Sequence, residues 1–302
     1  MRGDPSAASA GRLSERQLDQ LGEPIKGPRA LTDDWSRFWH LTYNIARNEF
    51  KLRFFGSVLG YAWQLMRPLL LFGVLYVFFT KVSHVNKLGG PGNRDYGAQL
   101  LGSIVLFTFF GEATGGAVRS VVDRENIVRK IHFPRLAIPL SVVLLAAFNL
   151  GLNLLVVLVF ATIEGVRPML SWLELPLIVV FLAVFATGIA MLLSALFVHF
   201  RDIQPIWEVL QQILFYSSPV IISFDTVREK LGATLVHLYM LNPLAVAFQQ
   251  FRHAMVTHGT PSAAQAIGGW AALAQPALIV VAFFAIGFWV FNRSAGLIAE
   301  NL

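Results

Sequence analysis

Four basic side chains within residues 47–68 are the first candidates for binding chemistry. Arg47, Lys51, Arg53 and Arg67 lie in the stretch RNEFKLRFFGSVLGYAWQLMRP, among aromatic residues and directly ahead of the apolar run LLLFGVLYVFF. Cations at such a junction can lie among lipid headgroups, enter the bilayer, or hold an anion. Their spacing alone leaves these three interpretations open.

The sequence lacks the motifs that mark nucleotide binding or covalent catalysis. It contains no Gly-x-x-x-x-Gly-Lys-Ser/Thr phosphate loop, no His-Glu-x-x-His pattern and no Gly-x-Ser-x-Gly elbow. It also contains no cysteine, which excludes disulfides, thiolate metal sites and cysteine nucleophiles, and its seven histidines are scattered. We therefore expect no catalytic residue, no metal site and no cofactor in this chain.

Glu112 is an acidic residue near the middle of the second apolar run. It lies in the segment FFGEATGG, where the small residues would let another helix approach closely. An ionisable residue within a span is costly and is a candidate for a proton relay. A relay needs a chain of such groups and none is evident, so we favour an interhelical hydrogen-bond acceptor.

Aromatic residues cluster in or beside three of the apolar runs. Aromatic side chains at span ends usually form the interfacial belt, and those in mid-span usually serve packing. Their faces can also stack on sugar rings, so a glycan-lining role remains the alternative. The candidates for such a lining are Tyr61, Trp63, Phe72, Tyr76, Phe107, Phe109, Phe110, Phe215 and Tyr216.

The composition is that of a membrane protein that crosses the bilayer several times. Hydrophobic residues make up 55% of the chain and charged residues only 14%, and the mean hydropathy is +0.59. The net charge is +6, but the basic residues are spread between apolar blocks, which argues against a nucleic-acid partner. Residues 1–33 contain no apolar core of the kind a cleaved signal needs, so we expect a flexible cytoplasmic tail.

Six apolar runs approach the roughly 20 residues that a helix needs to cross the hydrocarbon core. They cover residues 58–80, 100–121, 136–163, 172–198, 203–222 and 270–291. No internal repeat is visible, so the inverted-repeat plan of many secondary transporters has no support. The predicted fold is an all-α membrane protein with a transmembrane domain over residues 56–302.

The distribution of Lys and Arg predicts that both termini are cytoplasmic. Basic residues are concentrated before the first run and between the second and third runs, and this bias marks the cytoplasmic side. We therefore expect a cytoplasmic membrane protein whose loop 119–135 faces the cytoplasm and whose long segment 223–269 faces outward.

An amphipathic helix is predicted over residues 34–55. Apolar residues such as Trp35, Phe38 and Ala46 share one face, and basic residues such as Arg47 and Lys51 share the other. This pattern is typical of a helix that lies in the membrane interface, although a soluble partner could also cover the apolar face. Glu49 and Arg53 are four residues apart in the favoured order and can pair.

Two loops are long enough to carry structure of their own. Loop 119–135 is charged and compatible with a helix, and its Val and Ile residues suggest a docking surface for a soluble partner. In segment 223–269 a capping box precedes one short helix, and Asn242-Pro243 begins a second over residues 244–256. These outer helices predict either a gate or inert loop structure.

Several of these segments together resemble the ABC-2 type permeases that export lipid-linked polysaccharides, including O-antigen, teichoic acid and mycobacterial galactan. The resemblance runs from about Trp35 to the C-terminus. It rests on residues 47–63, on 126–134 ending in His-Phe-Pro, on Arg201-Asp-Ile with Ser218-Pro219-Val220, and on Leu241-Asn-Pro243 followed by Phe251-Arg252. The family would imply six transmembrane helices, an interfacial helix and two gate helices between spans five and six.

The resemblance also implies partners and site residues. This chain would form a homodimer with two nucleotide-binding ATPase subunits, which bind ATP and Mg²⁺ in its place, and would translocate a polyprenyl-diphosphate-linked glycan. The residues expected to dock the ATPase and couple its movement are Asp123, Arg124, Glu125, Asn126, Ile127, Arg129 and Lys130. The expected gate residues are Tyr239, Asn242, Pro243, Phe248, Phe251 and Arg252.

The four cations named first would then lie beside the entry for the lipid diphosphate. Arg67 departs from the family pattern, because similar permeases more often have a neutral residue before this proline. It can contact the diphosphate or snorkel to the inner headgroups, and we favour snorkelling. Alternative functions are an ABC-2 exporter of a drug or small lipid, a glycosyltransferase acting on polyprenyl-phosphate sugars, and a proton-coupled transporter.

Overall fold

The computed structural model describes residues 35–54, 60, 62–82, 96–125, 134–221, 227–228, 235–255 and 260–294, and these residues form helices and turns with no strand. The predicted tail at 1–33 lies outside them. The α-helices are α2 Trp35–Phe54, α3 Ala62–Val77, α4 Tyr96–Val118, α6 Ala137–Ile163, α7 Leu175–His199, α8 Ile203–Ser217, α10 Pro243–Met255, α11 Ala263–Ile267 and α12 Ala274–Ser294. Shorter turns of other helical types are η2 Phe78–Val82, η3 Leu170–Glu174 and η4 Trp270–Leu273.

Five of the six predicted spans are confirmed by length and composition. The helical segments Ala62–Thr80, Tyr96–Val118, Ala137–Ile163, Leu170–His199 and Trp270–Ser294 are long and apolar enough to cross a membrane. The fifth predicted span is shorter than expected, because α8 ends at Ser217. Pro219 disfavours helical geometry at the residue before it, and Ser218 is extended. At 1.5 Å per residue α8 is about 22 Å long, below the ~30 Å of a hydrocarbon core.

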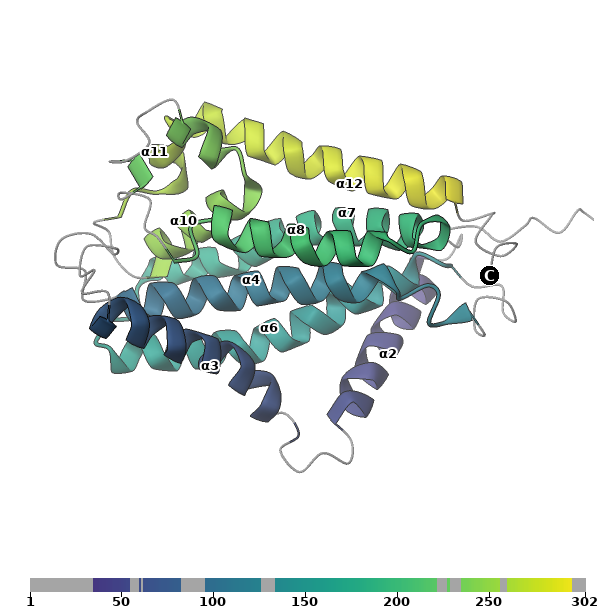
Figure 1. The fold of residues 1–302 in the computed structure, drawn as a ribbon, viewed down its shortest axis with the longest axis horizontal. Coiled ribbons are helices and arrows are strands. Elements are labelled where there is room, and N and C mark those ends of the chain that lie inside the picture. Colours follow the sequence, from purple (N-terminus) through teal and green to yellow (C-terminus); the bar gives the residue numbers. More distant parts are fainter. Residues whose placement is uncertain are drawn as a thin grey trace, which may run out of the picture.

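Helix α4 lies at the centre of the bundle, with α3, α6, α7, α8 and α10 packed around it (Figure 1). Most of its side chains are buried. Phe110 stacks on Phe185 of α7 with ring centroids 5.5 Å apart, and Trp207 of α8 lies 6.2 Å from the same ring. Large aromatic side chains thus fix how three helices face one another.

Helices α7 and α12 pack against each other. Gly188 of α7 and Gly287 of α12 lie at the crossing. A Cβ atom on Gly287 would overlap the carbonyl oxygen of Gly188, and one on Gly188 would lie 2.7 Å from the Phe284 backbone. Small residues at a helix crossing allow the backbones to approach closely in a membrane.

Helix α2 covers residues 35–54 of the amphipathic helix expected over 34–55, and residues 34 and 55 lie outside the described residues. Helix α2 is steeply inclined to the other long helices and packs on α6 (Figure 1). Phe38, Thr42 and Ala46 are buried, whereas Arg47 and Lys51 are exposed. The two faces are therefore those expected from the sequence, and the place of α2 at the membrane interface remains a prediction.

Candidate functional site

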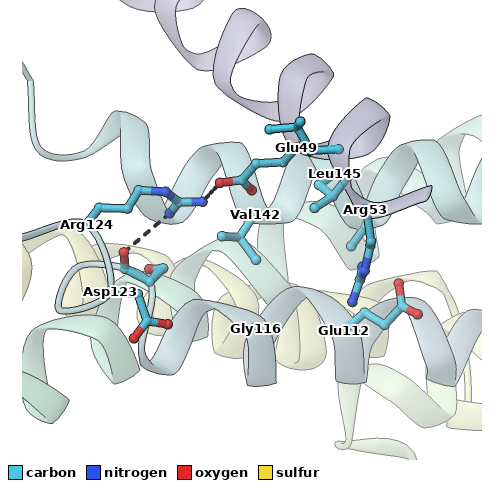
Figure 2. A pocket seen from close by; sticks show the side chains of 11 residues that line it. Glu49, Arg53, Glu112, Gly116, Asp123, Arg124, Val142 and Leu145 are labelled. Carbon is cyan, nitrogen blue, oxygen red and sulfur yellow. Dashed lines mark hydrogen bonds and ion pairs between the residues drawn. The ribbon is translucent and has the colours of Figure 1, made fainter. Parts of the chain in front are cut away.

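A cavity of about 570 Å³ lies where α2, α4 and α6 meet (Figure 2). Helix α2 contributes Glu49 and Arg53, and α6 contributes apolar side chains. Helix α4 and the turn that follows it, residues 119–124, contribute Glu112 and Arg124. Two cations and several acidic side chains therefore line one space at the junction of three helices.

An ion pair between Arg124 and Glu49 closes one side of the cavity. The side chains are 16% and 30% exposed, so the pair is shielded from much of the solvent. Arg124 also donates a hydrogen bond from Nη1 to the Ser120 carbonyl oxygen at 3.3 Å. Burial lowers the pKa of Arg124 from its usual value, because the charged form loses solvation. The pair connects helix α2 to the end of α4.

Glu49 takes a more distant partner than Arg53, with which its spacing would also allow a pair. Glu49 binds Arg124, which is 75 residues away in sequence, and Arg53 points toward Glu112 on the other side of the cavity (Figure 2). Spacing of four residues makes a local pair possible, but the packing of α2 on α6 turns Glu49 toward the end of α4.

Glu112 is held by amide side chains from two neighbouring helices. Its Oε1 accepts a hydrogen bond from Gln64 Nε2 of α3 at 2.6 Å, and its Oε2 accepts one from Asn149 Nδ2 of α6 at 2.8 Å. The predicted interhelical acceptor is thus confirmed. Sequence reasoning overlooked Gln64 and Asn149, although polar residues within apolar runs are the signal that could have identified them.

Replacing Glu112 with leucine is expected to lower the apparent melting temperature of the purified protein by several degrees. The change leaves the amides of Gln64 and Asn149 without their acceptor, at about 1–3 kcal/mol for each unsatisfied group. Glu112→Gln should reduce stability less than Glu112→Leu, because the side-chain amides of Gln64, Asn149 and the new glutamine can rotate to form hydrogen bonds with one another. Glu208→Leu, at an exposed carboxylate of α8, is the control. Equal stability of the Glu112→Leu and Glu208→Leu proteins would contradict this role.

The four predicted entry cations are not gathered in one place. Arg53 lines the cavity, whereas Arg47 and Lys51 lie on the exposed face of α2. Arg67 is exposed on α3, which continues as a helix through Pro68. Of the four, Arg53 alone lies where a ligand in the cavity would meet it.

The predicted ATPase-docking residues are described in part. Asn126, Ile127, Arg129 and Lys130 lie outside the described residues. Asp123 is 61% exposed on its side chain and lies 3.9 Å from Arg119, an exposed pair that contributes little to stability. Arg124 and Glu125 follow in the same turn. This turn presents charged side chains at the end of α4.

The predicted conduit aromatics divide into buried and exposed groups. Phe72, Phe109 and Phe110 are buried in the core, where they pack against other side chains. In this structure they line no open surface that a glycan could touch. Trp63 and Tyr216 are 46% and 76% exposed. The partly buried members are Tyr76, Phe107 and Phe215, of which Phe107 and Phe215 form an edge-to-face pair at 5.0 Å. Tyr61 lies outside the described residues.

The predicted gate residues lie on α10 or directly before it, and α10 packs into the bundle against α4 and α7. Asn242 caps this helix as expected: its Oδ1 accepts from the Leu244 N–H at 3.0 Å. Its Nδ2 donates to Ser218 Oγ at 3.1 Å. Pro243, Phe248 and Phe251 are buried, and Gly102 leaves the space that the Phe251 ring fills.

Arg252 ties α10 to the segment that follows α8. Its guanidinium is buried and donates hydrogen bonds to the carbonyl oxygens of Pro219 and Val220, the latter at 3.2 Å. Burial raises the pKa of Tyr239 above its usual range, and nearby Arg252 acts in the opposite direction. The buried cation therefore fixes the position of α10 relative to the end of α8.

Replacing Arg252 with glutamine is expected to lower the apparent melting temperature by several degrees. The shorter side chain cannot reach both carbonyl oxygens, and a hydrogen bond to a charged group is worth about 1.5–3 kcal/mol. Arg228→Gln, at an exposed position, should leave stability unchanged. A melting temperature equal to that of the parent protein would show that Arg252 does not hold α10.

Comparison with known proteins matches this chain to one family of membrane transporters and to export permeases. The sequence model of the ABC-2 type transporter family matches residues 40–256. Two O-antigen export system permease proteins RfbA of Klebsiella pneumoniae are 31% and 30% identical over 129 residues, which is 43% of this chain and 48% of each relative. The O-antigen export system permease protein RfbA of Myxococcus xanthus is 27% identical over 223 residues, covering 74% of this chain and 83% of the relative. The chain thus aligns with about half the length of the first two relatives.

Proposed function

Because this chain belongs to the ABC-2 type transporter family, we propose that it is the permease subunit of an ATP-driven exporter of lipid-linked polysaccharide. Its substrate would be a polyprenyl-diphosphate-linked glycan of the O-antigen, teichoic-acid or galactan kind, carried across the cytoplasmic membrane. The observation that carries this proposal is the alignment with an O-antigen export permease over 74% of the chain.

The proposed assembly is a homodimer with two separate ATPase subunits. The sequence contains no phosphate loop, so ATP and Mg²⁺ would bind to the partner. The turn after α4 and the segment that follows it would dock that partner on the cytoplasmic side, with both termini on the same side. In this assembly α8 would act as the sixth membrane-crossing element.

The cavity between α2, α4 and α6 would be the entry vestibule for the lipid diphosphate. Arg53 would meet the diphosphate there, because its cation faces the cavity. Arg47 and Lys51 would attract the anionic headgroup along the exposed face of α2, and Arg67 would remain at the inner headgroups. Beyond the vestibule, the glycan would pass the exposed aromatics Trp63 and Tyr216, and α10 would form the outer gate.

The Glu49–Arg124 pair would transmit movement within this assembly. Arg124 lies in the proposed docking turn, and Glu49 lies on the helix that forms one wall of the vestibule. A shift of the docking turn would therefore pull on α2 through a partly buried ion pair. ATP-driven movement at the partner would thereby change the entry cavity.

Affinity purification of the tagged chain from its membrane tests the proposal. An ATP-hydrolysing subunit should copurify, and depletion of the chain should leave its lipid-linked glycan on the cytoplasmic side. If no such subunit copurifies and polymer export continues after depletion, the proposed function is wrong. Intact polymer export with loss of resistance to a drug would favour a small-molecule exporter instead.

A further inference from the structure

A second, apolar groove lies at the N-terminal end of α2, whereas the charged cavity lies at its C-terminal end. Its volume is about 490 Å³, and its lining comes from α2, α6, α7 and α12. Carbon atoms dominate the lining, and the hydroxyl of Thr187 is satisfied by the Ala183 carbonyl oxygen at 2.7 Å. Such a lining favours a hydrocarbon occupant over a sugar or phosphate.

The length of the groove matches one leaflet of a bilayer. On α6 the lining runs from Leu136 to Ala147, and on α7 from Val180 to Met191. Each stretch advances eleven residues, about 16 Å at 1.5 Å per residue, which is close to half of a ~30 Å hydrocarbon core. Trp35 and Trp39 are 63% and 42% exposed at the α2 rim, as expected of indoles at a headgroup boundary.

A buried cation comes directly before the groove lining in the chain. Arg135 directly precedes Leu136, the first lining residue on α6, and is only 2% exposed. Its Nη1 is buried and has no hydrogen-bond partner in the described part of the chain. A buried guanidinium without a partner is costly, and a phosphate matches its geometry and charge. On α2, Arg37 and His40 are exposed close to the two tryptophans, which adds basic character to this rim.

We propose that this groove binds one anionic glycerophospholipid of the inner leaflet, with an acyl chain against α6 and α7 and the phosphate at Arg135. The lipid would fill the angle between α2 and the bundle and hold the interfacial helix in place. Residues 1–34 of this chain are a poor alternative occupant, because they contain no sustained apolar run. The inference depends on the membrane location of the chain and is separate from the proposed transport function.

Native mass spectrometry of the full-length protein tests the lipid site. The delipidated protein in mild detergent is mixed with equal amounts of phosphatidylglycerol and phosphatidylcholine. The parent protein should retain phosphatidylglycerol at least about threefold more than phosphatidylcholine, since charge-assisted contacts to phosphate exceed neutral ones. Arg135→Gln should remove this preference, and Ala183→Phe, which fills the groove, should lower retention of both lipids several-fold.

Two matched variants control for general effects of charge and bulk. Arg201→Gln removes an exposed arginine at another turn, and Ala282→Phe adds the same ring to an exposed position of α12 outside the groove lining. Both should behave like the parent. Arg135→Gln leaves the groove volume unchanged. If Ala183→Phe fails to fold, the lipid preference of Arg135→Gln is therefore the result that tests the lipid site.

Three results would overturn the lipid site. These are equal retention of the two lipids by the parent protein, an unchanged preference in Arg135→Gln, and a polyprenyl phosphate in place of phospholipid in the protein as isolated. The measurement involves no transport. The lipid site can therefore be disproved without affecting the proposed transport function, and the transport function can be disproved without affecting the lipid site.

Discussion

Reversing the charge of Arg124 is expected to reduce glycan export by at least about tenfold, the effect of raising a barrier by about 1.4 kcal/mol. In the Arg124→Glu variant two carboxylates would face each other where an ion pair now joins α2 to the end of α4. Removing one partner of a fully buried pair costs about 3–5 kcal/mol. A smaller cost is expected here, because the side chains are partly exposed.

The double reversal separates this pair from a general effect of charge. Adding Glu49→Arg to Arg124→Glu restores opposite charges across the same contact and should recover a large part of the lost export. Arg167→Glu, at an exposed position away from the cavity, should export like the parent. ATPase activity and complex assembly are measured in parallel, so that loss of coupling is distinguished from loss of the partner. A double reversal no better than the worse single variant would contradict the transmitting role.

A methyl group at the α7–α12 crossing is expected to cause a large loss of stability. In Gly287→Ala the new Cβ would overlap the Gly188 carbonyl oxygen, and in Gly188→Ala it would press on the Phe284 backbone. Overpacking typically costs about 1–3 kcal/mol, and a backbone obstacle cannot move aside as a side chain can. We therefore expect little folded protein from either variant after solubilisation.

Two other helical glycines give matched controls for this prediction. At Gly73 of α3 and Gly151 of α6, an added Cβ would meet no atom within 4 Å. Their alanine variants should be neutral or more stable by about 0.5–1 kcal/mol, because alanine favours the helix. Size-exclusion profiles after heating compare the four proteins. If Gly287→Ala survives heating as well as Gly151→Ala, the helices do not cross as described.

The spans and the amphipathic character of α2 were predictable because they depend on local patterns. Uninterrupted apolar runs of the required length identify spans without knowledge of their neighbours. The alternation of Phe38 and Ala46 with Arg47 and Lys51 likewise identifies the two faces of α2. The predicted end of α8 was wrong because the apolar run continues through Ser218-Pro219, where the proline ends the helix.

The contacts between helices that form the candidate site were much harder to predict from the sequence than the helices themselves. An apolar run does not show which face of its helix points toward the other helices. Phe110, which is in the core, and Tyr216, which is on the surface, were therefore equally plausible conduit residues. Glu112 could be singled out, but its donors Gln64 and Asn149 come from two other helices. The Glu49–Arg124 pair depends on how α2 packs against the bundle, which no local spacing encodes.

Reconstituted transport is the most direct test of ATP-driven movement of a lipid-linked glycan by this chain. The chain and its copurified ATPase are placed in proteoliposomes with a fluorescent polyprenyl-diphosphate oligosaccharide in the ATP-exposed leaflet. Transfer to the opposite leaflet is followed by protection from a membrane-impermeant glycosidase added with the ATP. Protection should require both ATP and the lipid diphosphate, and it should be lost in Arg124→Glu. Glycan that stays accessible with an active ATPase, or transfer that proceeds equally without the lipid anchor, would contradict the proposed transport function.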